Sequence, residues 1–167
     1  MTKAEQSKQA ISEALLRLLK NHEYGKITLQ NIVDEAGVSR MAFYRNFESK
    51  DAVIKYYLDK VTDDFIIEHD VDFEKDAIDE YCNKLIPHLV THRRIGELLI
   101  KADLFDYMRT EFNRALVRKA KNREDTIRYY YIAGGICNVY WYWLTNGCKE
   151  SPQELTDILQ YTMKRIV

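Results

Sequence analysis

The scarcity of chain-breaking residues is the feature that most constrains the fold of this chain. Only two prolines, Pro87 and Pro152, and six glycines occur in 167 residues. Because proline and glycine interrupt helices, such a chain favours long helices over many short strands. No stretch alternates apolar and polar residues as a half-buried strand does. We therefore expect an all-α protein with enough residues for one or two small domains, each with a core.

Apolar residues recur at intervals of three and four along much of the chain, as they do on one face of a helix. Thr28, Ser39 and Ser49 precede three such segments in the position that caps a helix N-terminus, and Gly37 ends the segment 29–36. The expected helices cover 4–20, 29–36, a short segment from Ser39, a long one from Ser49, 72–93 with a kink at Pro87, 95–123 as one helix or two, 124–146 and 151–165.

Composition argues against several classes of function. The net charge is −1, so charge alone does not suggest a nucleic-acid partner. Three cysteines without a Cys-x-x-Cys pair favour reduced thiols in a cytoplasmic protein over disulfides or a zinc site. The start lacks the apolar run of a secretory signal, and no segment has the length of a membrane span. Without a nucleophile elbow, phosphate loop or carboxylate pair, we expect no enzyme and no cofactor.

Two short helices joined by a turn at Gly37-Val38 predict a helix-turn-helix, whose second helix enters the major groove of DNA. On that second helix Phe43 and Phe47 should point to the core, whereas Met41 and Arg45 lie opposite. The alternative for this stretch is a plain helical hairpin with a solvated basic face.

The outer side of this motif has the chemistry that DNA binding requires. Arg40 and Arg45 can each hold O6 and N7 of guanine, and Met41 and Ala42 can contact a thymine methyl group. Other polar side chains, and the amide ends of the two capped helices, suit phosphate oxygens. The expected DNA-binding residues are Thr28, Gln30, Ser39, Arg40, Met41, Ala42, Tyr44, Arg45, Asn46 and Lys50.

The stretch "ITLQNIVDEAGVSRMAFYRNFESKDAVI" resembles the DNA-binding domain of the tetracycline-repressor (TetR/AcrR) family. The residues that carry the resemblance are Thr28, Ala36 to Ser39, Tyr44, Phe47 and Ser49 to Asp51. The resemblance implies a homodimer that binds a palindromic operator and represses transcription. It also implies that a small effector releases the DNA by binding to the C-terminal helices.

The resemblance further implies roles for particular residues. Arg40, Met41-Ala42 and Arg45 correspond to positions that face bases, and Tyr44 and Lys50 to positions that hold phosphate. Met41-Ala42 replaces a common Gly-Thr pair, so the operator sequence cannot be transferred. The alternative function is a dimeric helical protein-interaction module, or a regulator controlled by a protein partner instead of a small ligand.

The C-terminal half is expected to carry the dimer interface. Residues 131–159 follow the family outline of an aromatic-glycine helix, Trp-Leu, a glycine and a Ser-Pro-capped helix. The helix 124–146 is apolar nearly all round, so it needs cover on two sides. With 151–165 it can form a four-helix contact across a two-fold axis, where Gly134 and Gly135 permit close approach. One large monomer core is the alternative. The expected interface residues are Tyr140, Trp143, Leu144, Leu155 and Leu159.

We divide the chain into a DNA-binding domain, 1–48, and a regulatory and dimerisation domain, 49–167. An effector pocket for a small apolar or aromatic molecule should lie in the second domain, against Phe65. His88 and His92 have the spacing of a helical metal pair, but no third ligand is evident and we expect no metal. The pocket candidates, each of which would also suit plain core, are Tyr81, His88, His92, Phe105, Met108, Tyr131, Asn138 and Trp141.

Overall fold

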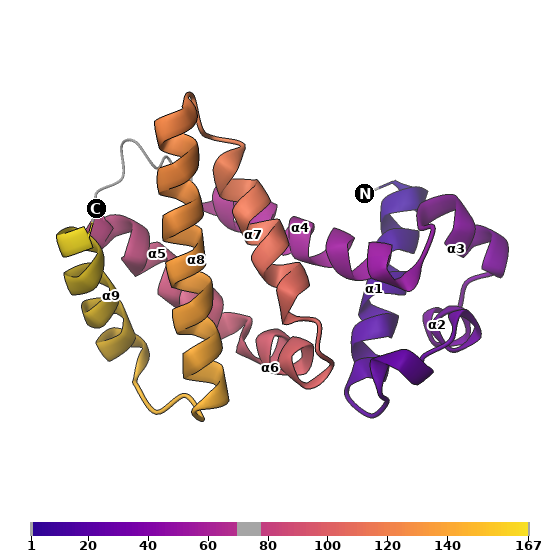
Figure 1. Cartoon of the computed structure of the whole chain (residues 1–167). Helices are drawn as coiled ribbons and strands as arrows, with labels where there is room; N and C mark the ends of the chain where they lie inside the picture. Colours follow the sequence, from indigo (N-terminus) through magenta and orange to yellow (C-terminus); the bar gives the residue numbers. More distant parts are fainter. Residues whose placement is uncertain (1, 70–77, 167) are drawn as a thin grey trace.

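The computed structural model describes residues 2–69 and 78–166, and within these ranges the protein is all-α, as expected, with no strand. Helices α1 to α3 lie at one end of the molecule and α9 at the opposite end, with α4 running from the first group toward the rest (Figure 1). The helices are α1 (Lys3–Leu19), α2 (Leu29–Ala36), α3 (Arg40–Asn46), α4 (Lys50–Glu68), α5 (Ile78–Thr91), α6 (Arg93–Lys101), α7 (Phe105–Val117), α8 (Arg123–Thr145) and α9 (Pro152–Ile166), with a 3-10 turn at Tyr24–Lys26.

Local chemistry sets the ends of the first helices. The hydroxyl oxygens of Thr28, Ser39 and Ser49 each accept a hydrogen bond from the backbone N–H three residues later, at 3.2, 3.1 and 3.1 Å. Gly37 has φ 65°, in the left-handed region where a side chain introduces strain. The three N-caps and the glycine stop predicted from the sequence are therefore confirmed.

In the middle of the chain the structure has two helices where the sequence left one or two open. The segment expected at 95–123 as one helix or two forms α6 and α7, with a break at 102–104. Asp103 in this break has φ 59°, a left-handed conformation that ends a helix. Of the helix expected at 72–93, residues 72–77 lie outside the described residues. The described part, α5, contains Pro87.

The first core lies where α1, α2 and α3 meet the first half of α4. Phe43 of α3 and Ile32 of α2 are completely buried in it, and Leu58 of α4 is 4% exposed. Leu99 of α6 and Leu104, just after that helix, belong to the same core. The second half of the chain therefore closes one side of the DNA-binding domain.

The second core is built by α5, α8 and α9 together with the last turns of α4 and the start of α7. It includes all five residues expected at a dimer interface, none more than 7% exposed: Tyr140, Trp143, Leu144, Leu155 and Leu159. The Tyr140 hydroxyl donates to the Leu89 carbonyl oxygen at 2.9 Å, and Nε1 of Trp143 donates to the Glu150 carbonyl oxygen at 3.0 Å. Because these side chains are buried within one subunit, their assignment to the interface is wrong.

Helix α4 contributes to both cores. Its residues up to Leu58 pack in the first core and Phe65 packs in the second. Between these points its outer side carries Asp59, which pairs with Arg114 of α7. The division drawn at residue 49 thus coincides with the start of α4, although the first half of that helix packs with the preceding domain.

The left-handed cap gives a prediction about stability. Gly37→Ala should lower the free energy of unfolding by about 1–2 kcal/mol, because Cβ is strained at φ 65°. Gly25→Ala is the matched control, since Gly25 has no positive φ and a Cβ there would meet nothing within 4 Å. We expect the control to be neutral or slightly stabilising in urea unfolding. Equal losses from both substitutions would contradict the assignment.

Candidate DNA-binding surface and internal cavity

The turn between α2 and α3 is only three residues long, 37–39, and its hydrogen bonds fix it. The Gly37 amide donates to the Asp34 carbonyl oxygen at 3.2 Å, and the Val38 amide donates to the Val33 carbonyl oxygen at 3.0 Å. This is the pattern of a glycine-terminated helix end. Ser39, the last residue of the turn, is the N-cap of α3, so the second helix begins directly after the turn.

Helix α3 has a buried side and an exposed side. Phe43 is completely buried, whereas Met41 and Tyr44 are 72% and 63% exposed. Arg40 and Arg45 are exposed as well, and neither has an ion-pair partner within residues 2–69 and 78–166. Two free guanidinium groups beside an exposed thioether match the donors and apolar groups that read base edges in a major groove.

The expected DNA-binding residues of α2 are at the surface and have partners within that helix. Oγ1 of Thr28 accepts from the Asn31 amide at 3.2 Å, and Oδ1 of Asn31 accepts from the Thr28 amide at 2.9 Å. Nε2 of Gln30 donates to the Asp34 carboxylate at 2.6 Å. Thr28 and Gln30 are both exposed and therefore accessible to a phosphate backbone.

Lys50 has partners inside the subunit that its sequence position did not reveal. Its Nζ donates to the carbonyl oxygens of Tyr24 at 2.7 Å and Ile27 at 3.1 Å, and lies 4.2 Å from the centroid of the Tyr24 ring. The Tyr24 hydroxyl donates in turn to the Asp51 carboxylate. Lys50 therefore holds the chain that enters α2, and only one of its three N–H donors remains for a phosphate.

Asn46, also expected to bind phosphate, joins α3 to α1. Its Nδ2 donates to the Ala42 carbonyl oxygen at 2.7 Å and to Oγ of Ser7 at 3.3 Å. The side chain is half-buried between the two helices. It thus has a supporting role that the sequence reading missed, because Ser7 is 39 positions away along the chain.

A small cavity lies in the second core between α4, α5, α7 and α8. Its volume is about 50 Å³. A water molecule occupies about 30 Å³ in the liquid, and ligand pockets usually reach about 300–1,000 Å³. The cavity is therefore almost closed in this conformation. The lining residues are Val61, Thr62, Phe65, Leu85, His88, Leu89, His92, Met108, Phe112, Ile136, Cys137 and Tyr140.

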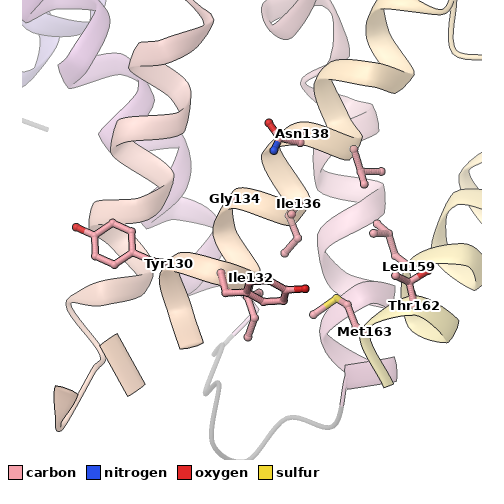
Figure 2. Close-up of a pocket in the computed structure, with 11 residues that line it drawn as sticks. Tyr130, Ile132, Gly134, Ile136, Asn138, Leu159, Thr162 and Met163 are labelled. Carbon is pink, nitrogen blue, oxygen red and sulfur yellow. The ribbon is translucent and has the colours of Figure 1, made fainter. Parts of the chain in front are cut away.

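The structure separates the eight expected pocket residues into three groups. Those lining the cavity are His88, His92 and Met108. Those buried in the second core without lining the cavity are Tyr81 and Phe105. Those exposed on the outer side of α8 are Tyr131, Asn138 and Trp141. None of these last three lines the internal cavity, because α8 is apolar on two sides and its spacing does not show which side faces inward; Tyr131 and Asn138 instead line a separate space of about 450 Å³ between α8 and α9 (Figure 2). Phe65 lines the cavity, as expected.

The remaining lining residues were missed because they look like ordinary core. The signal that could have found some of them is helical spacing on α5, where Leu85 and Leu89 share a face with His88 and His92. Ile136 and Cys137 on α8 have no comparable signal, since apolar residues occur all round that helix.

A row of aromatic rings borders the cavity. The His88 ring lies 4.7 Å from the Phe65 ring and 4.3 Å from the His92 ring, and the His69 ring lies 5.0 Å from Phe65, centroid to centroid. Burial, and then the neighbouring His92 and His69, lowers the pKa of His88 to about 4. His88 is therefore neutral at pH 7, which suits an apolar cavity. In the parts of the chain that the structure describes, no group of three or more His, Cys, Asp or Glu side chains is placed to hold a metal ion.

The exposed cationic side of α3, the short turn and the capped helices define a helix-turn-helix DNA-binding regulator. Residues 11–57 match the family model of bacterial regulatory proteins of the tetR family, and residues 76–165 match a transcriptional regulator C-terminal region. The second match alone covers more than half of the chain. The chain therefore belongs to the TetR family of transcription regulators, and it is a regulator and not an enzyme.

Several solved structures share this fold at low sequence identity. A TetR transcriptional regulator from Streptococcus agalactiae 2603V has a TM-score of 0.65 at 20% identity, over 96% of this chain and 94% of that chain. The dihydroxyacetone kinase operon activator DhaS has a TM-score of 0.66 at 14% identity, over 96% of both chains. The TetR family repressor AlkX from Dietzia sp. strain DQ12-45-1b, implicated in biodegradation of n-alkanes, has a TM-score of 0.53 at 15% identity, over 92% and 91%. At such identities the likeness shows the fold alone. No curated protein sequence matches the chain.

Among the helices of residues 2–69 and 78–166, none combines the length and the apolar character needed to cross a bilayer.

The two free arginines of α3 give a prediction about sequence reading. Arg40→Ala and Arg45→Ala should each cost about 1–3 kcal/mol of operator binding and relax the preference at one base position, because a bidentate contact to guanine is lost. Lys50→Ala should weaken binding to all sequences alike. The measurement is binding of each variant to a selected operator and to random DNA of equal length. Equal losses on both DNAs for the arginine variants would contradict base reading.

The buried imidazole gives a prediction about pH. The pKa of His88 is lowered to about 4 in the folded chain, against an ordinary value near 6.5 when unfolded. Between these values the unfolded chain binds the extra proton, so stability is complete above pH 6.5 and is lost as the pH falls toward 4. The loss should be on the order of 1 kcal/mol, because the side chain keeps some solvent contact.

The test compares urea unfolding from pH 4 to pH 7 for the parent chain and His88→Gln, which should show a flatter pH profile. His22→Gln, at an exposed histidine, is the control and should keep the parent profile. Parallel profiles for the parent and His88→Gln would exclude this residue as the source.

Proposed function

We propose that this protein is a dimeric transcriptional repressor that leaves a palindromic operator when a small apolar or aromatic molecule binds inside its second core. The observation that carries the proposal is that one helix, α4, connects the exposed cationic helix to the apolar cavity. It begins at Lys50, next to α3, and its later residues Val61, Thr62 and Phe65 line the cavity. Because bacterial chromosomes lie in the cytoplasm, we place the protein there.

Operator recognition rests on the exposed side of α3. Arg40 and Arg45 are free to hold guanines, and Met41 beside Ala42 offers apolar contact to thymine. The exposed hydroxyl of Tyr44, together with Thr28, Gln30, Ser39 and the remaining donor of Lys50, would position the domain on phosphates. Two such helices in a two-fold dimer must be about 34–36 Å apart to meet successive major grooves on one side of the DNA.

The ligand would change DNA binding through the contact between α4 and α7. Asp59 and Asp63, one turn apart on α4, pair with Arg114 and Arg118, one turn apart on α7. These pairs are partly exposed, so each is worth at most about 1 kcal/mol and serves mainly to align the two helices. Since both helices line the cavity, a ligand that enlarges it must move them relative to each other.

Linkage sets the size of the required effect. A ligand releases DNA only if it binds the DNA-free conformation better than the DNA-bound one. A hundredfold preference corresponds to about 2.7 kcal/mol of coupling between the two sites. The free energy comes from burying the apolar surface of the ligand, less the cost of opening the cavity.

A second candidate is a regulator controlled by a protein partner. The observation in its favour is the cavity volume of about 50 Å³, which leaves no room for a small effector unless the helices move. That the protein represses transcription and does not activate it is also part of the proposal, since the similar structures include both an operon activator and a repressor.

The principal experiment is a gel shift with the DNA that flanks the gene encoding this chain, followed by transcription of that DNA in vitro with and without the protein. We expect a retarded complex and reduced transcription. Titrating a library of apolar and aromatic metabolites into the complex then tests release. Increased transcription would contradict repression. Ligands that bind without changing operator affinity would contradict the effector switch.

Filling the cavity should separate ligand control from DNA binding. Cys137 is buried at the cavity wall, and Cys137→Met would extend a longer side chain into the space. We expect operator affinity to stay within about twofold and release by the ligand to be lost, as judged by the same gel shift. Cys137→Ala leaves the space open and is the matched control, which should still respond. If both variants respond like the parent chain, the ligand acts elsewhere.

A further inference from the structure

An outer groove lies next to the two histidines that line the internal cavity. The groove runs between α4 and α5 and has a volume of about 400 Å³, whereas the volume of the cavity is about 50 Å³. Val61 of α4 and His88 and His92, from α5 and the residue that follows it, line both spaces. A single layer of side chains therefore separates an open groove from the nearly closed cavity.

The groove is acidic, unlike the cavity. Its acidic residues are Asp64 and Glu68, both exposed, and no Lys or Arg of the described residues lines it. They lie one turn apart on α4 and therefore on the same side of that helix. Glu68 is also the last residue of α4, where carbonyl groups without helical partners add partial negative charge. His88 adds no positive charge at pH 7, because burial and the neighbouring histidines lower its pKa to about 4.

Contacts within the described part of the subunit do not explain these two carboxylates. On the same helix, Asp59 and Asp63 pair with arginines of α7. Asp64 and Glu68 have no ion-pair partner within residues 2–69 and 78–166. Like charges one turn apart repel each other and destabilise a helix slightly. A cation bound in the groove would relieve this repulsion.

The order of the two environments determines which molecules fit. The inner cavity is apolar, with Phe65, Leu85 and Phe112 in its wall, and the groove outside it attracts positive charge. A fitting ligand therefore has an apolar tail and a cationic group at its outer end. The carboxylate head of a fatty acid would be repelled by the two carboxylates of the groove. A lysine side chain from a protein partner would have the reverse order, because its charged end would enter first.

We propose that the ligand of this regulator is an amphipathic amine, with its ammonium group in the groove beside Asp64 and Glu68 and its hydrocarbon tail in the inner cavity. The ammonium group donates charge-assisted hydrogen bonds to the carboxylate oxygens. The His88 and His92 rings are 4.3 Å apart, centroid to centroid, so the tail must displace one of them to enter. The inference rests on the proposed function and names the class of molecule that would release the operator.

The first test compares head groups on one tail. Octylammonium, octanol and octanoate have the same hydrocarbon chain and differ in charge. We expect octylammonium to bind the parent chain about tenfold or more tightly than octanol, and octanoate to bind more weakly than either. The measurement is titration calorimetry at pH 8, which lies above the ordinary pKa of an imidazole and below that of an alkylammonium group.

The second test removes the carboxylates one at a time. Asp64→Asn and Glu68→Gln should each weaken octylammonium binding about two- to fivefold, because an exposed charge pair contributes no more than that. Neither substitution should change the affinity for octanol, which has no charge. Glu124→Gln is the matched control, since Glu124 is an exposed carboxylate on α8 outside the groove. It should leave the affinity for octylammonium unchanged.

The third test locates the tail. Octylammonium should bind the parent chain about tenfold more tightly than hexylammonium, since it buries two more CH₂ groups. In Cys137→Met the longer side chain occupies the inner cavity, so the two amines should bind alike. Cys137→Ala leaves the cavity open and should keep the difference between them. A tail that lies only in the outer groove would give the same difference in all three proteins.

The outcomes separate the class of ligand from the effector switch. Equal affinities for octylammonium and octanol, or tighter binding of octanoate, would overturn the inference. Unchanged octylammonium binding when Asp64→Asn and Glu68→Gln are combined would do the same. If octanol or octanoate releases the operator in the gel shift and octylammonium does not, the proposed function stands and this inference falls. If octylammonium binds as expected and operator affinity does not change, the ligand site stands and the effector switch of the proposed function fails.

Discussion

Helix α4 is one continuous helix whose side chains are buried in two different cores, and the arrangement of the other helices depends on it. Leu58 and Phe65 are seven positions apart, about 10 Å along the helix axis. A helix of this length does not bend freely, so neither core can shift without carrying α4 with it. The ion pairs to α7 and the packing of Leu99 and Leu104 against the first core strengthen this connection from the other side. The DNA-binding helices are thus positioned by residues more than fifty positions away.

The parts of the fold that could be predicted from the sequence are those decided by neighbouring residues. A serine or threonine hydroxyl reaches the amide three residues later whatever the rest of the molecule does, and a glycine at φ 65° needs no distant partner. The start and end of α2, the start of α3 and the exposed side of α3 could therefore be predicted from the sequence. The family pattern in this region consists of such local features, which explains why it could be recognised over residues 27–54.

The parts that could not be predicted depend on which of two similar surfaces faces inward. In α8 apolar residues occur on both sides, so periodicity could not decide between Tyr140 and Trp141, which are adjacent yet 2% and 45% exposed. The expected interface was thus placed on the buried side, and three expected pocket residues turned out to be on the outer side. Lys50 illustrates the same limit for charge. A lysine near a DNA-binding helix suggests a contact with phosphate, but the Nζ of Lys50 donates hydrogen bonds to the carbonyl oxygens of Tyr24 and Ile27.

The near-closure of the internal cavity has a consequence for what such a regulator can sense. If the open form makes up about 1% of the molecules, a ligand binds a hundredfold more weakly than its contacts alone would allow, a cost of about 2.7 kcal/mol. Small apolar metabolites with few carbon atoms bury too little surface to meet that cost. A larger molecule that fills an opened cavity of 300 Å³ or more can meet it. The free energy needed to open the helix packing around Phe65 and His88 would then set the minimum affinity of an effective ligand. The protein would not bind small, abundant molecules and would respond only to a narrow class of larger ones.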